Sequence, residues 1–563
     1  MNTLETALHL HKTGQFEQAE ILYRQLIEKD PTFTEAIHAL AILLAMQQHY
    51  DEANELVHRA IALHPNNLAY LNTLGNIYLG KNNYGKAIQT YEQVLTLNSR
   101  YVPALNNLGK CHYQQKNYQK AHNVYQKAIE LKPDNTDALF NLALTDIQLN
   151  DHLSALKHLK QSLDINANNS SAQYQLAQLY LQQQNYLLAE THLKHCLSIA
   201  PCHGNALHDL GLIFLFNQDY KKAIEKIIAA IDNDCLDSFA HYHLAIAYLE
   251  NKDNTNALQH FLRQTQINKD FASYYNAAVI LMHQNRHQDA LMYFNIALKQ
   301  QPNHLPIHVN IAGIYLKMQK LEAAISHYEK ALTLNPLDQE IQHILNALKQ
   351  TDTPDAAPTQ YVQHLFDSYA NYFDEHLTQH LAYATPEKIQ KALEMEASAD
   401  TDSQWCLLDL GCGTGLMGER VKPYCKELIG IDISEAMLAQ AKQKNIYDQL
   451  IKADIHSALK TSTFTYDVVL AADVFTYIGN LEPIFQLIYQ RMKHQGWFAF
   501  SVERSNKKGF ELQTNIRYAH HKAYVVEIAE RCGFKVIRCD NLILRKQYKQ
   551  DVEGYLFIFY KEI

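Results

Sequence analysis

Alanine recurs through the first 350 residues at an almost constant interval. The series is Ala19, Ala53, Ala87, Ala121, Ala155, Ala189, Ala223, Ala257, Ala290 and Ala324, with steps of 34 residues seven times, then 33, then 34. Glycine or alanine stands 12 residues before most of these positions, and proline often follows 12 residues after. Such a period indicates stacked helix pairs, because one pair cannot bury its apolar face alone. The small residues let two helices approach closely, and the proline ends the second helix.

The 34-residue unit resembles the tetratricopeptide repeat. The match is clearest over residues 74–91 and 108–133, where glycine, alanine, tyrosine and proline stand at the consensus positions. The resemblance covers about residues 1–336 in ten units, and residues 338–348 are predicted to form an amphipathic helix that seals the last unit. The sequence therefore predicts an all-α solenoid of stacked repeats over residues 1–350.

Amide side chains stand 14 residues before the periodic alanine in several units. These residues are Asn107, Asn141, Asn276 and Asn310. In the repeat family the first helix of each unit lines the inner face, and the resemblance implies that such asparagines grip an extended peptide backbone. An amide offers both donors and an acceptor for this purpose. The alternative is that these amides hydrogen-bond neighbouring helices or water. We expect a protein or peptide partner in the groove.

A second constraint lies at residues 406–415, where a short apolar run contains an acid and leads into three alternating glycines. The acid is Asp409, and the glycines are Gly411, Gly413 and Gly415. The run predicts a buried strand, and glycine lets the backbone lie against a ligand without an intervening Cβ. A strand, a glycine loop and a helix together place a nucleoside-type ligand at the carboxyl end of a parallel sheet. A dinucleotide is disfavoured, because its loop requires Gly-x-Gly-x-x-Gly.

Strands and helices alternate from Trp405 onward. Strands are predicted at residues 406–410, 428–432, 449–454, 466–474, 497–503, 535–545 and 555–560. Helices are predicted to start at residue 416 and to span residues 434–444, 481–492 and 522–532. This alternation is typical of an open parallel sheet with helices on both faces. The last two strands have no helix between them, so they are predicted to form an antiparallel hairpin.

The glycine loop and the acids at successive strand ends resemble the class I S-adenosylmethionine-dependent methyltransferases over about residues 361–563. The resemblance implies a Rossmann-like domain with a seven-stranded sheet, in which the glycine loop and its acid cradle the methionine part of S-adenosyl-L-methionine. It implies that Asp432, at the end of the second strand, binds both ribose hydroxyls through bonds worth ~1.5–3 kcal/mol each. Asp454 would hold the adenine amino group. Ile433 and Ile455 are expected to contact the same cofactor.

A helical, aromatic-rich segment at residues 361–393 precedes the first strand. Many of these methyltransferases carry a similar helix that caps the cofactor, so the resemblance implies that Tyr369 contacts it. Tyr369 and Phe373 share a helix face, and the alternative is that both are core aromatics. Residues 351–360 are small, polar and proline-punctuated, which predicts a short linker. The whole chain resembles a subgroup in which tetratricopeptide repeats precede the methyltransferase domain.

Methyl transfer has a neutral leaving group, so such an enzyme contributes mainly positioning. A protonated acceptor would also need a base. The candidates are Asp473 and Tyr477, which follow the fourth strand, and His520, whose imidazole ordinarily titrates near neutral pH. The chain lacks a Pro-Pro-Tyr/Phe motif after the fourth strand, which disfavours adenine N6 and glutamine as acceptors.

The composition disfavours several other classes of protein. A net charge of −9 and a pI of about 6.4 disfavour binding to nucleic acid. The sequence contains no apolar run of about 18 residues that would predict a membrane span, and its first residues do not resemble a secretory signal. Nine cysteines without a Cys-x-x-Cys pair are typical of free thiols in a reducing cytoplasm. No metal ligand is predicted.

The sequence thus predicts a cytoplasmic methyltransferase whose repeat array recruits a protein, with that protein as the methyl acceptor. One alternative is a small-molecule methyltransferase that uses the array for localisation or assembly. The other is a non-catalytic interaction scaffold. The acceptor atom and the oligomeric state stay open at this point.

Overall fold

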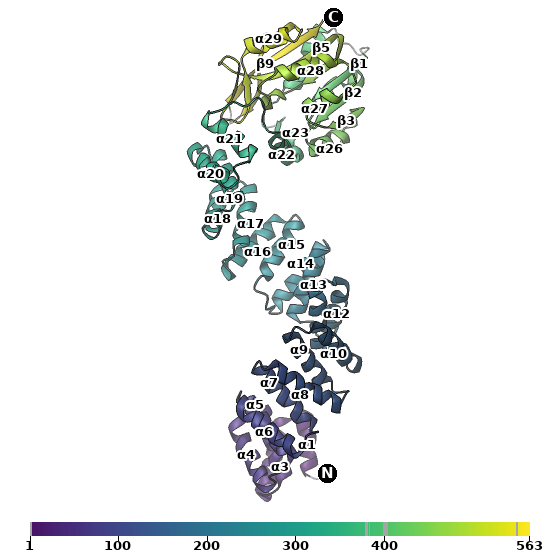
Figure 1. Ribbon diagram of the computed structural model, residues 1–563, viewed down its shortest axis with the longest axis vertical. Coiled ribbons are helices and arrows are strands. Elements are labelled where there is room, and N and C mark those ends of the chain that lie inside the picture. Colours follow the sequence, from purple (N-terminus) through teal and green to yellow (C-terminus); the bar gives the residue numbers. More distant parts are fainter. Residues whose placement is uncertain (1–2, 378–380, 382, 398–403, 548–549, 563) are drawn as a thin grey trace. The chain divides into compact units, whose positions relative to one another are not determined.

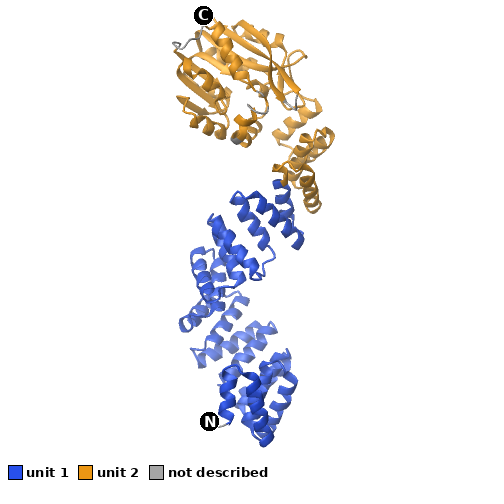
Figure 2. Cartoon of the chain, turned by 180° about the vertical axis from the view of Figure 1, so that it is seen from behind, with its two compact units in different colours: residues 1–280 blue, residues 281–563 orange. Residues whose placement is uncertain are grey.

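The computed structural model describes residues 3–377, 381, 383–397, 404–547 and 550–562. The chain divides into two compact units, residues 1–280 and residues 281–563 (Figure 2). Helices fill the first unit, and an α/β domain makes up most of the second (Figure 1). The division falls inside the repeats, so the last repeats belong to the same unit as the α/β domain.

Consecutive helices of the first unit pack as pairs, which confirms the predicted all-α repeat array. The helices are α1 (Thr3–Lys12), α2 (Phe16–Lys29), α3 (Thr34–Met46), α4 (Tyr50–Leu63), α5 (Leu68–Gly80), α6 (Tyr84–Leu97), α7 (Val102–Gln114), α8 (Tyr118–Leu131), α9 (Thr136–Gln148), α10 (His152–Ile165), α11 (Ser170–Gln182), α12 (Tyr186–Ile199), α13 (Gly204–Phe216), α14 (Tyr220–Asp232), α15 (Ala240–Glu250), α16 (Asn254–Ile267) and α17 (Phe271–His283), which crosses into the second unit.

Small residues and tyrosines fit together inside the pairs as the period predicts. A Cβ placed on Gly109 would lie 2.6 Å from a ring carbon of Tyr125, which is itself buried. The turn inside each pair uses one residue with a positive φ of 57–65°. These residues are Gln48, Asn82, Lys116, Asn150, Gln184, Gln218 and Lys252, again spaced by 34. Only Gly14 supplies a glycine at this position, so the sequence gives little sign of the left-handed turn.

The second unit begins with the last repeats. Its helices continue with α18 (His287–Gln300), α19 (Leu305–Lys317), α20 (Leu321–Leu334) and α21 (Gln339–Lys349). Asp338 caps α21, because its carboxylate accepts from the amides of Glu340 and Ile341 at 3.1 Å each. This helix lies where the sequence predicts the sealing helix.

Over the described residues, the α/β domain contains one sheet of nine strands rather than the seven predicted. The strands are β1 (Trp405–Leu410), β2 (Cys425–Asp432), β3 (Gln449–Lys452), β4 (Tyr466–Ala471), β5 (Met492–Arg504), β6 (Phe510–Leu512), β7 (Tyr518–His520), β8 (Lys535–Gln547) and β9 (Gln550–Lys561). The order β3-β2-β1-β4-β5 is parallel, β9 runs antiparallel to β5, and β8 pairs with β9 as the predicted hairpin. The short hairpin β6–β7 is the addition, and β7 pairs with the end of β5.

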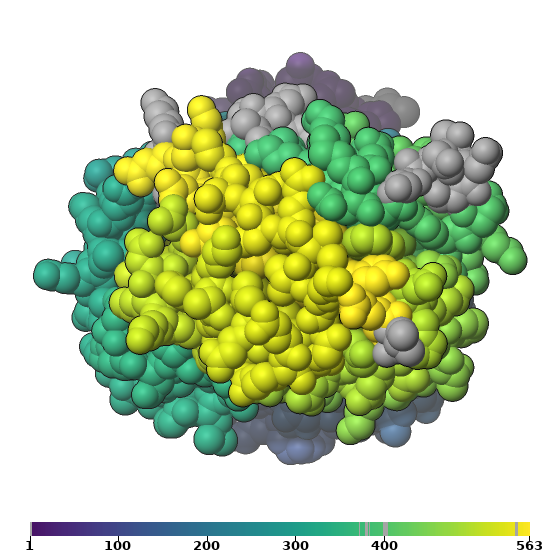
Figure 3. Space-filling view, turned by 90° about the horizontal axis from the view of Figure 1, so that it is seen from above, coloured from purple at the N-terminus to yellow at the C-terminus, as the bar shows by residue number. Residues whose placement is uncertain are grey.

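Helices cover both faces of this sheet, as predicted. The helices of the domain are α22 (Thr359–Tyr369), α23 (Phe373–Glu375), α24 (Thr385–Glu396), α25 (Leu416–Val421), α26 (Glu435–Gln443), α27 (Ile455–Thr461), α28 (Glu482–Arg491) and α29 (Lys522–Arg531), with a 3-10 turn η1 (Ala370–Tyr372) after α22. One buried cluster joins the sheet to α27, α28 and α29, and another joins it to α24 and α25. The last strands also form an outer surface of the domain, yellow in Figure 3.

The segment predicted as a linker is attached to the α/β domain. The amide of Ala357 donates to the carbonyl of Tyr477 at 2.9 Å, and the carbonyl of Asp355 accepts from the amide of Gly479 at 2.8 Å. Helix α21 itself contacts the β6–β7 hairpin in a buried cluster of Ala347, Leu512 and Tyr518. The last repeat and the domain therefore share a packed seam, and the domain limits at residues 350 and 361 stay predictions.

Candidate active site

A cavity of about 580 Å³ lies at the carboxyl ends of β1, β2, β3 and β4. This volume falls within the range of about 300–1,000 Å³ typical of ligand pockets. Most of the residues expected at the site line it: Tyr369, Gly411, Gly413, Asp432, Ile433, Asp454, Ile455, Asp473 and Tyr477. Among the described residues, Asp409, Gly415 and His520 are not part of its lining.

The glycine loop after β1 forms one wall of the cavity. Gly411 and Gly413 have φ values of 62° and 54°, a region that favours glycine. A Cβ on Gly411 would lie 2.7 Å from Val474, so no side chain fits there. A Cβ on Gly413 would meet only Phe373, at 3.8 Å, so its backbone faces open space. Gly415 instead packs against Tyr447, because a Cβ there would lie 3.0 Å from that ring.

Asp432 is fixed beside this loop at the end of β2. One carboxylate oxygen accepts from the amide of Gly413 at 2.8 Å, and the other accepts from the amide of Ser434 at 2.8 Å. Burial raises the pKa of Asp432, while these backbone amides oppose the rise. Each carboxylate oxygen has a second lone pair, so the side chain can still accept hydrogen bonds from a ligand in the cavity.

Asp409 does not face the cavity, which corrects its predicted role as a direct cofactor contact. Its carboxylate accepts a hydrogen bond from the Tyr447 hydroxyl at 2.6 Å, and only 1% of the residue is exposed. Burial raises the pKa of Asp409 to about 7. Asp409 therefore supports the glycine loop through Tyr447, which also packs on Gly415 and Gly418.

The third acid, Asp454, lies two residues beyond β3 and caps α27. Its carboxylate accepts from the amide of Ser457 at 2.9 Å. The third strand is therefore shorter than the predicted residues 449–454, and the unpredicted α27 follows it directly after the cap. Asp454 still lines the cavity beside Ile455.

The aromatic segment before β1 covers the cavity. Tyr369 and Phe373 form an edge-to-face pair with ring centroids 5.0 Å apart, and Phe366 contacts the Tyr477 ring at 5.4 Å. Asp367 accepts from the hydroxyl of Ser434 at 2.6 Å, which anchors α22 to the N-terminus of α26. Ser434 also caps α26 by accepting from the amide of Met437.

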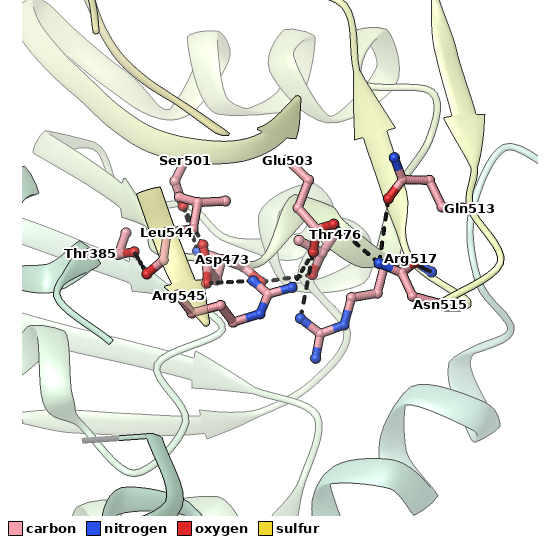
Figure 4. A network of polar contacts seen from close by, with 10 residues as sticks. All are labelled: Thr385, Asp473, Thr476, Ser501, Glu503, Gln513, Asn515, Arg517, Leu544 and Arg545. Carbon is pink, nitrogen blue, oxygen red and sulfur yellow. Dashed lines mark hydrogen bonds and ion pairs between the residues drawn. The ribbon is translucent and has the colours of Figure 1, made fainter. Parts of the chain in front are cut away.

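Charged residues converge on the cavity wall that follows β4 (Figure 4). The Arg545 guanidinium donates to Asp473 at 3.1 Å and to Glu503. The other oxygen of Asp473 accepts from the hydroxyl of Ser501 at 2.8 Å. The Arg545 and Glu503 side chains are only 3% and 2% exposed. Asp473, which has a φ of 58°, is thus held in an ion pair rather than left available as a base.

Arg517 reaches the same wall from the turn before β7. Its nearest guanidinium nitrogen lies 3.6 Å from Glu503, and its guanidinium carbon lies 5.9 Å from the centroid of the Tyr477 ring. Burial alone would lower the pKa of Arg517, but Tyr477, Glu503 and Asp473 raise it overall, so the guanidinium stays charged.

His520 lies outside the cavity, which corrects its predicted role as a base that contacts the acceptor. It is fully buried, and its Nε2 hydrogen-bonds the carbonyl of Gly479 at 3.0 Å. Burial lowers the pKa of His520 to about 4. The ring stacks on Tyr524, and its role is to pack the β6–β7 hairpin.

Arg517 and Arg545 were not predicted as site residues. Each stands next to a run of apolar or aromatic residues in the sequence, Arg545 after residues 542–544 and Arg517 before residues 518–519. Arginine is rarely buried without a partner. An arginine beside apolar residues in a strand is therefore the sequence feature that could have indicated a buried ion pair at the site.

The asparagines of the repeat array lie on the first helices of their pairs, and two of them contact neighbouring side chains. Asn107 on α7 donates to Asn76 on α5 at 2.8 Å. Asn276 on α17 hydrogen-bonds the Tyr242 hydroxyl. Asn141 lies on α9 and Asn310 on α19, and both are half-buried. The alternative of contacts between neighbouring helices therefore holds for Asn107 and Asn276.

One cluster in the array has donor atoms suited to a metal. His208, Asp237 and His243 place their ligand atoms within 4.8 Å of one another. The rings of His208 and His243 already contact each other at 3.0 Å, and Asp237 lies 3.5 Å from the other nitrogen of His208. One hydrogen bond and one longer contact between an imidazole and a carboxylate therefore account for the cluster. In the described part of the chain, no helix combines the length and apolarity that crossing a membrane requires.

Comparison with protein families assigns both regions. Residues 408–500 match the methyltransferase domain family. Tetratricopeptide repeat families match residues 10–77, 75–116, 102–135, 136–169, 170–202, 208–270 and 269–336. The chain thus joins tetratricopeptide repeats to a methyltransferase domain.

Curated relatives match mainly the C-terminal domain. The probable S-adenosylmethionine-dependent methyltransferase CRG1 of Saccharomyces cerevisiae is 37% identical over 103 residues, or 17% of this chain and 34% of that protein. The ubiquinone biosynthesis O-methyltransferase of Azoarcus sp. is 32% identical over 111 residues, 18% of this chain and 46% of that protein. The malonyl-[acyl-carrier protein] O-methyltransferase of Halalkalibacterium halodurans is 29% identical over 205 residues, 35% and 70% respectively. The chain spans less than half the length of the first curated relatives it matches.

Solved structures match the repeats. The TPR protein YrrB is 21% identical with a TM-score of 0.30, and the match covers 34% of this chain and 97% of that one. MamA is 20% identical with a TM-score of 0.28, and the match covers 30% and 91%.

Proposed function

We propose that this chain, in which tetratricopeptide repeats precede a methyltransferase domain, is an S-adenosylmethionine-dependent methyltransferase whose repeat array binds a protein partner. The observation that carries the proposal is the cavity at the carboxyl ends of β1 to β4, where Asp432 and the glycine loop meet. A ligand at this edge of a parallel sheet is expected from the fold.

The residues present fit S-adenosylmethionine. The open backbone at Gly413 leaves room for the methionine part, and the Asp432 carboxylate retains free acceptor capacity for the two ribose hydroxyls. Asp454 and Ile455, at the start of α27, would hold the adenine. Tyr369 and Phe373 would cover the ligand and exclude water.

When bound, the cofactor supplies an activated methyl group on a positively charged sulfur. The chain's own residues then have to orient an acceptor and exclude water, which is the main contribution of such an enzyme. Tyr477, Arg517 and Arg545 line the cavity, and we place the acceptor beside them. Asp473 orients Arg545 through their ion pair.

Calorimetric titration of the full chain with S-adenosylmethionine tests the proposal. Asp432→Ala removes two charge-assisted hydrogen bonds of ~1.5–3 kcal/mol each, so affinity should fall about 100-fold or more. Asp432→Asn, which keeps one acceptor, should lose less. Asp551→Asn, at the exposed start of β9, is the matched control and should bind as the wild type does. Equal affinity of the wild type and Asp432→Ala would remove the basis for this cofactor site.

A protein partner is proposed for the first helices that carry Asn107, Asn141 and Asn276 in the first unit and Asn310 in the second. These amides lie on first helices of their pairs, and a row of amides suits an extended peptide backbone. A partner held close to the cavity would have a raised effective concentration as methyl acceptor. No nucleic acid is proposed as a partner, since the net charge is −9.

Two experiments on the full chain separate the protein acceptor from its alternatives. Partners captured by the wild type, but lost with Asn141→Ala and Asn310→Ala, should gain label from methyl-labelled cofactor. Partners that bind and never gain label would favour a small-molecule acceptor, with the array used for localisation. If Asp432→Ala retains every cellular role of the wild type, a scaffold is the better description.

A reducing cytoplasm is proposed as the location. All nine cysteines are free thiols in the structure, including four buried or half-buried in the sheet region near β1 and β2 or on β8. The test is to refold the protein under oxidising conditions and to count the cysteines that react with a thiol reagent. Nine reactive thiols would agree with this proposal, and stable disulfides would contradict it.

A further inference from the structure

Arg517 is the cation on the cavity wall whose guanidinium can still donate hydrogen bonds to a ligand. Arg545 is committed to Asp473 and Glu503 and is 3% exposed. Arg517 lines the same cavity with 28% of its side chain exposed, and its contact with Glu503 is the longer one, at 3.6 Å. A guanidinium carries five donors in a planar fork, so most of its donors can serve a molecule in the cavity.

The charges on this wall limit the kind of anion that fits. Arg517 and Arg545 balance Asp473 and Glu503, so the four side chains are together neutral. A bound S-adenosylmethionine would add one net positive charge through its sulfonium. Asp432 and Asp454 also line the cavity, so acids already outnumber the two arginines there. A singly charged carboxylate therefore meets less repulsion than a phosphate dianion, which would add two negative charges beside the buried Glu503. A planar carboxylate also matches the fork of an arginine.

A described general base is lacking on this wall. His520 lies outside the cavity, and the Asp473 carboxylate is held in its ion pair with Arg545 and in a hydrogen bond from Ser501. Tyr477 contributes a hydroxyl, which can donate to an acceptor oxygen. His456 also lines the cavity, but from α27 beside Asp454. Among the described residues, the wall that carries Arg517 therefore suits an acceptor that arrives without a proton to lose.

We propose that the methyl acceptor is a carboxylate held by Arg517, and that a carboxylate oxygen receives the methyl group. The oxygen forms a bond to the methyl carbon as the carbon–sulfur bond breaks, and the sulfur keeps the electron pair as a neutral thioether. The carboxylate becomes a neutral methyl ester, and no proton is transferred. This inference rests on the proposed methyltransferase function and assigns its acceptor class.

The rest of the wall indicates an apolar body on the acceptor. Val362, Leu365 and Ile484 line the cavity together with the aromatic rings of the covering segment. The probe is therefore a six-carbon series: hexanoate, hexanol and hexyl phosphate. Each is titrated into the full chain with and without sinefungin, a non-transferable analogue that carries a protonated amine in place of the sulfonium.

We expect hexanoate to bind the wild type, more tightly with sinefungin, and Arg517→Met to weaken it about 10- to 100-fold. Arg517→Lys should lose less, because it keeps the charge but not the fork. Arg504→Met is the matched control, since Arg504 is an exposed arginine on β5 paired with Glu553. Sinefungin affinity should be equal in all variants, which also shows that they are folded.

Each other outcome overturns the assignment. Hexanol binding as well as hexanoate, an unchanged affinity in Arg517→Met, or no hexanoate binding at any soluble concentration would remove Arg517 as the anion site. Tighter binding of hexyl phosphate than hexanoate would replace the carboxylate with a phosphate. If the wild type fails to bind sinefungin, the proposed function fails. The affinity of the wild type and of Arg517→Met for hexanoate alone still tests whether Arg517 binds the carboxylate.

The methylated atom has its own readout. Extract of the source cells is incubated with the full chain and methyl-labelled S-adenosylmethionine, and the products are treated with alkali. A methyl ester releases its label as volatile methanol, and this label should fall in Arg517→Met but not in Arg504→Met. Label that resists alkali would overturn oxygen as the acceptor atom.

Discussion

In the repeat array, polar side chains connect the first helix of one pair to the first helix of the next, whereas in the α/β domain they converge on one edge of the sheet. Asn107 reaches Asn76 across 31 residues, and Gln178 reaches Asp209 across the same spacing. At the cavity, Arg545 instead joins Asp473 on the loop after β4 and Glu503 on β5, which no period relates. Repetition spreads stability over many equivalent contacts, and convergence concentrates it in a few.

The comparison predicts the largest loss of stability for Arg545→Met in the domain. Removing this cation leaves Asp473 and Glu503 without their main partner, which should cost about 3–5 kcal/mol of unfolding free energy. Both tryptophans of the chain, Trp405 and Trp497, lie in the domain. Their fluorescence during urea denaturation therefore reports the domain alone.

Arg504→Met is the control for this measurement. Its exposed ion pair with Glu553 should contribute at most about 1 kcal/mol. If both variants lose the same small amount, stability in the domain is as distributed as in the array.

A smaller effect is expected for Gly109→Ala in the array. The new Cβ would lie 2.6 Å from the buried Tyr125 ring, so overpacking should cost about 1–3 kcal/mol. Gly313→Ala on α19 is matched to it, because a Cβ there meets nothing within 4 Å. That substitution should stabilise its helix by about 0.5–1 kcal/mol. Thermal denaturation followed by circular dichroism measures both, and equal effects would mean that the small residue is not required by the ring.

The pH dependence of the domain should carry the signature of Asp409. Burial raises the pKa of this carboxyl from its ordinary value near 4 to about 7. The folded state therefore binds a proton more tightly than the unfolded state, and the free energy of unfolding falls as pH rises from about 4 to about 7. The slope from this group is at most about 1.4 kcal/mol per pH unit.

Asp409→Asn removes this component while an amide oxygen can still accept from Tyr447. Tryptophan fluorescence at a series of pH values should show a flatter profile in the variant. Parallel profiles for wild type and variant would place the ionisation of Asp409 outside this range.

The smallest effect sharpens the role of the asparagines in the array. Asn107→Ala should cost about 0.5 kcal/mol, because its hydrogen bond to Asn76 is exposed. Asn76→Ala should cost more, since Asn76 also accepts from the Tyr91 hydroxyl at 2.6 Å. A double-mutant cycle measures the coupling. A coupling free energy of zero would mean that the hydrogen bond between Asn107 and Asn76 does not stabilise the array. Peptide binding would then be the remaining role for Asn107.

The two regions also differ in what the sequence could reveal. The array follows from one period, because the small residue, the ring and the proline repeat often enough to set the helices. The left-handed turn residue escaped notice, since mostly Gln, Asn and Lys occupy it rather than glycine. An exceptional residue in one unit does not hide a position that the other units repeat. The period therefore predicts the helices of the array.

In the domain, the sequence predicts the strand ends but not the direction of each side chain. Asp432 and Asp454 line the cavity, while Asp409, only two residues before the glycine loop, turns to Tyr447. The chemistry of His520 predicts a base, but its ring is buried and hydrogen-bonds the carbonyl of Gly479. The partners of Asp473 lie 28 and 72 residues away along the chain, and only the folded sheet brings them together.

The seam between α21 and the β6–β7 hairpin limits where the repeats can be separated from the methyltransferase domain. Gln350 donates to the carbonyl of Leu512 at 2.9 Å, and five residues after Leu512 the same hairpin supplies Arg517. Removing residues 1–350, which include α21, would expose Leu512 and Tyr518 to water. It would also loosen the turn that positions the Arg517 guanidinium. The final helix of the repeats is therefore part of the framework of the pocket, and the smallest dissectable catalytic piece begins before it.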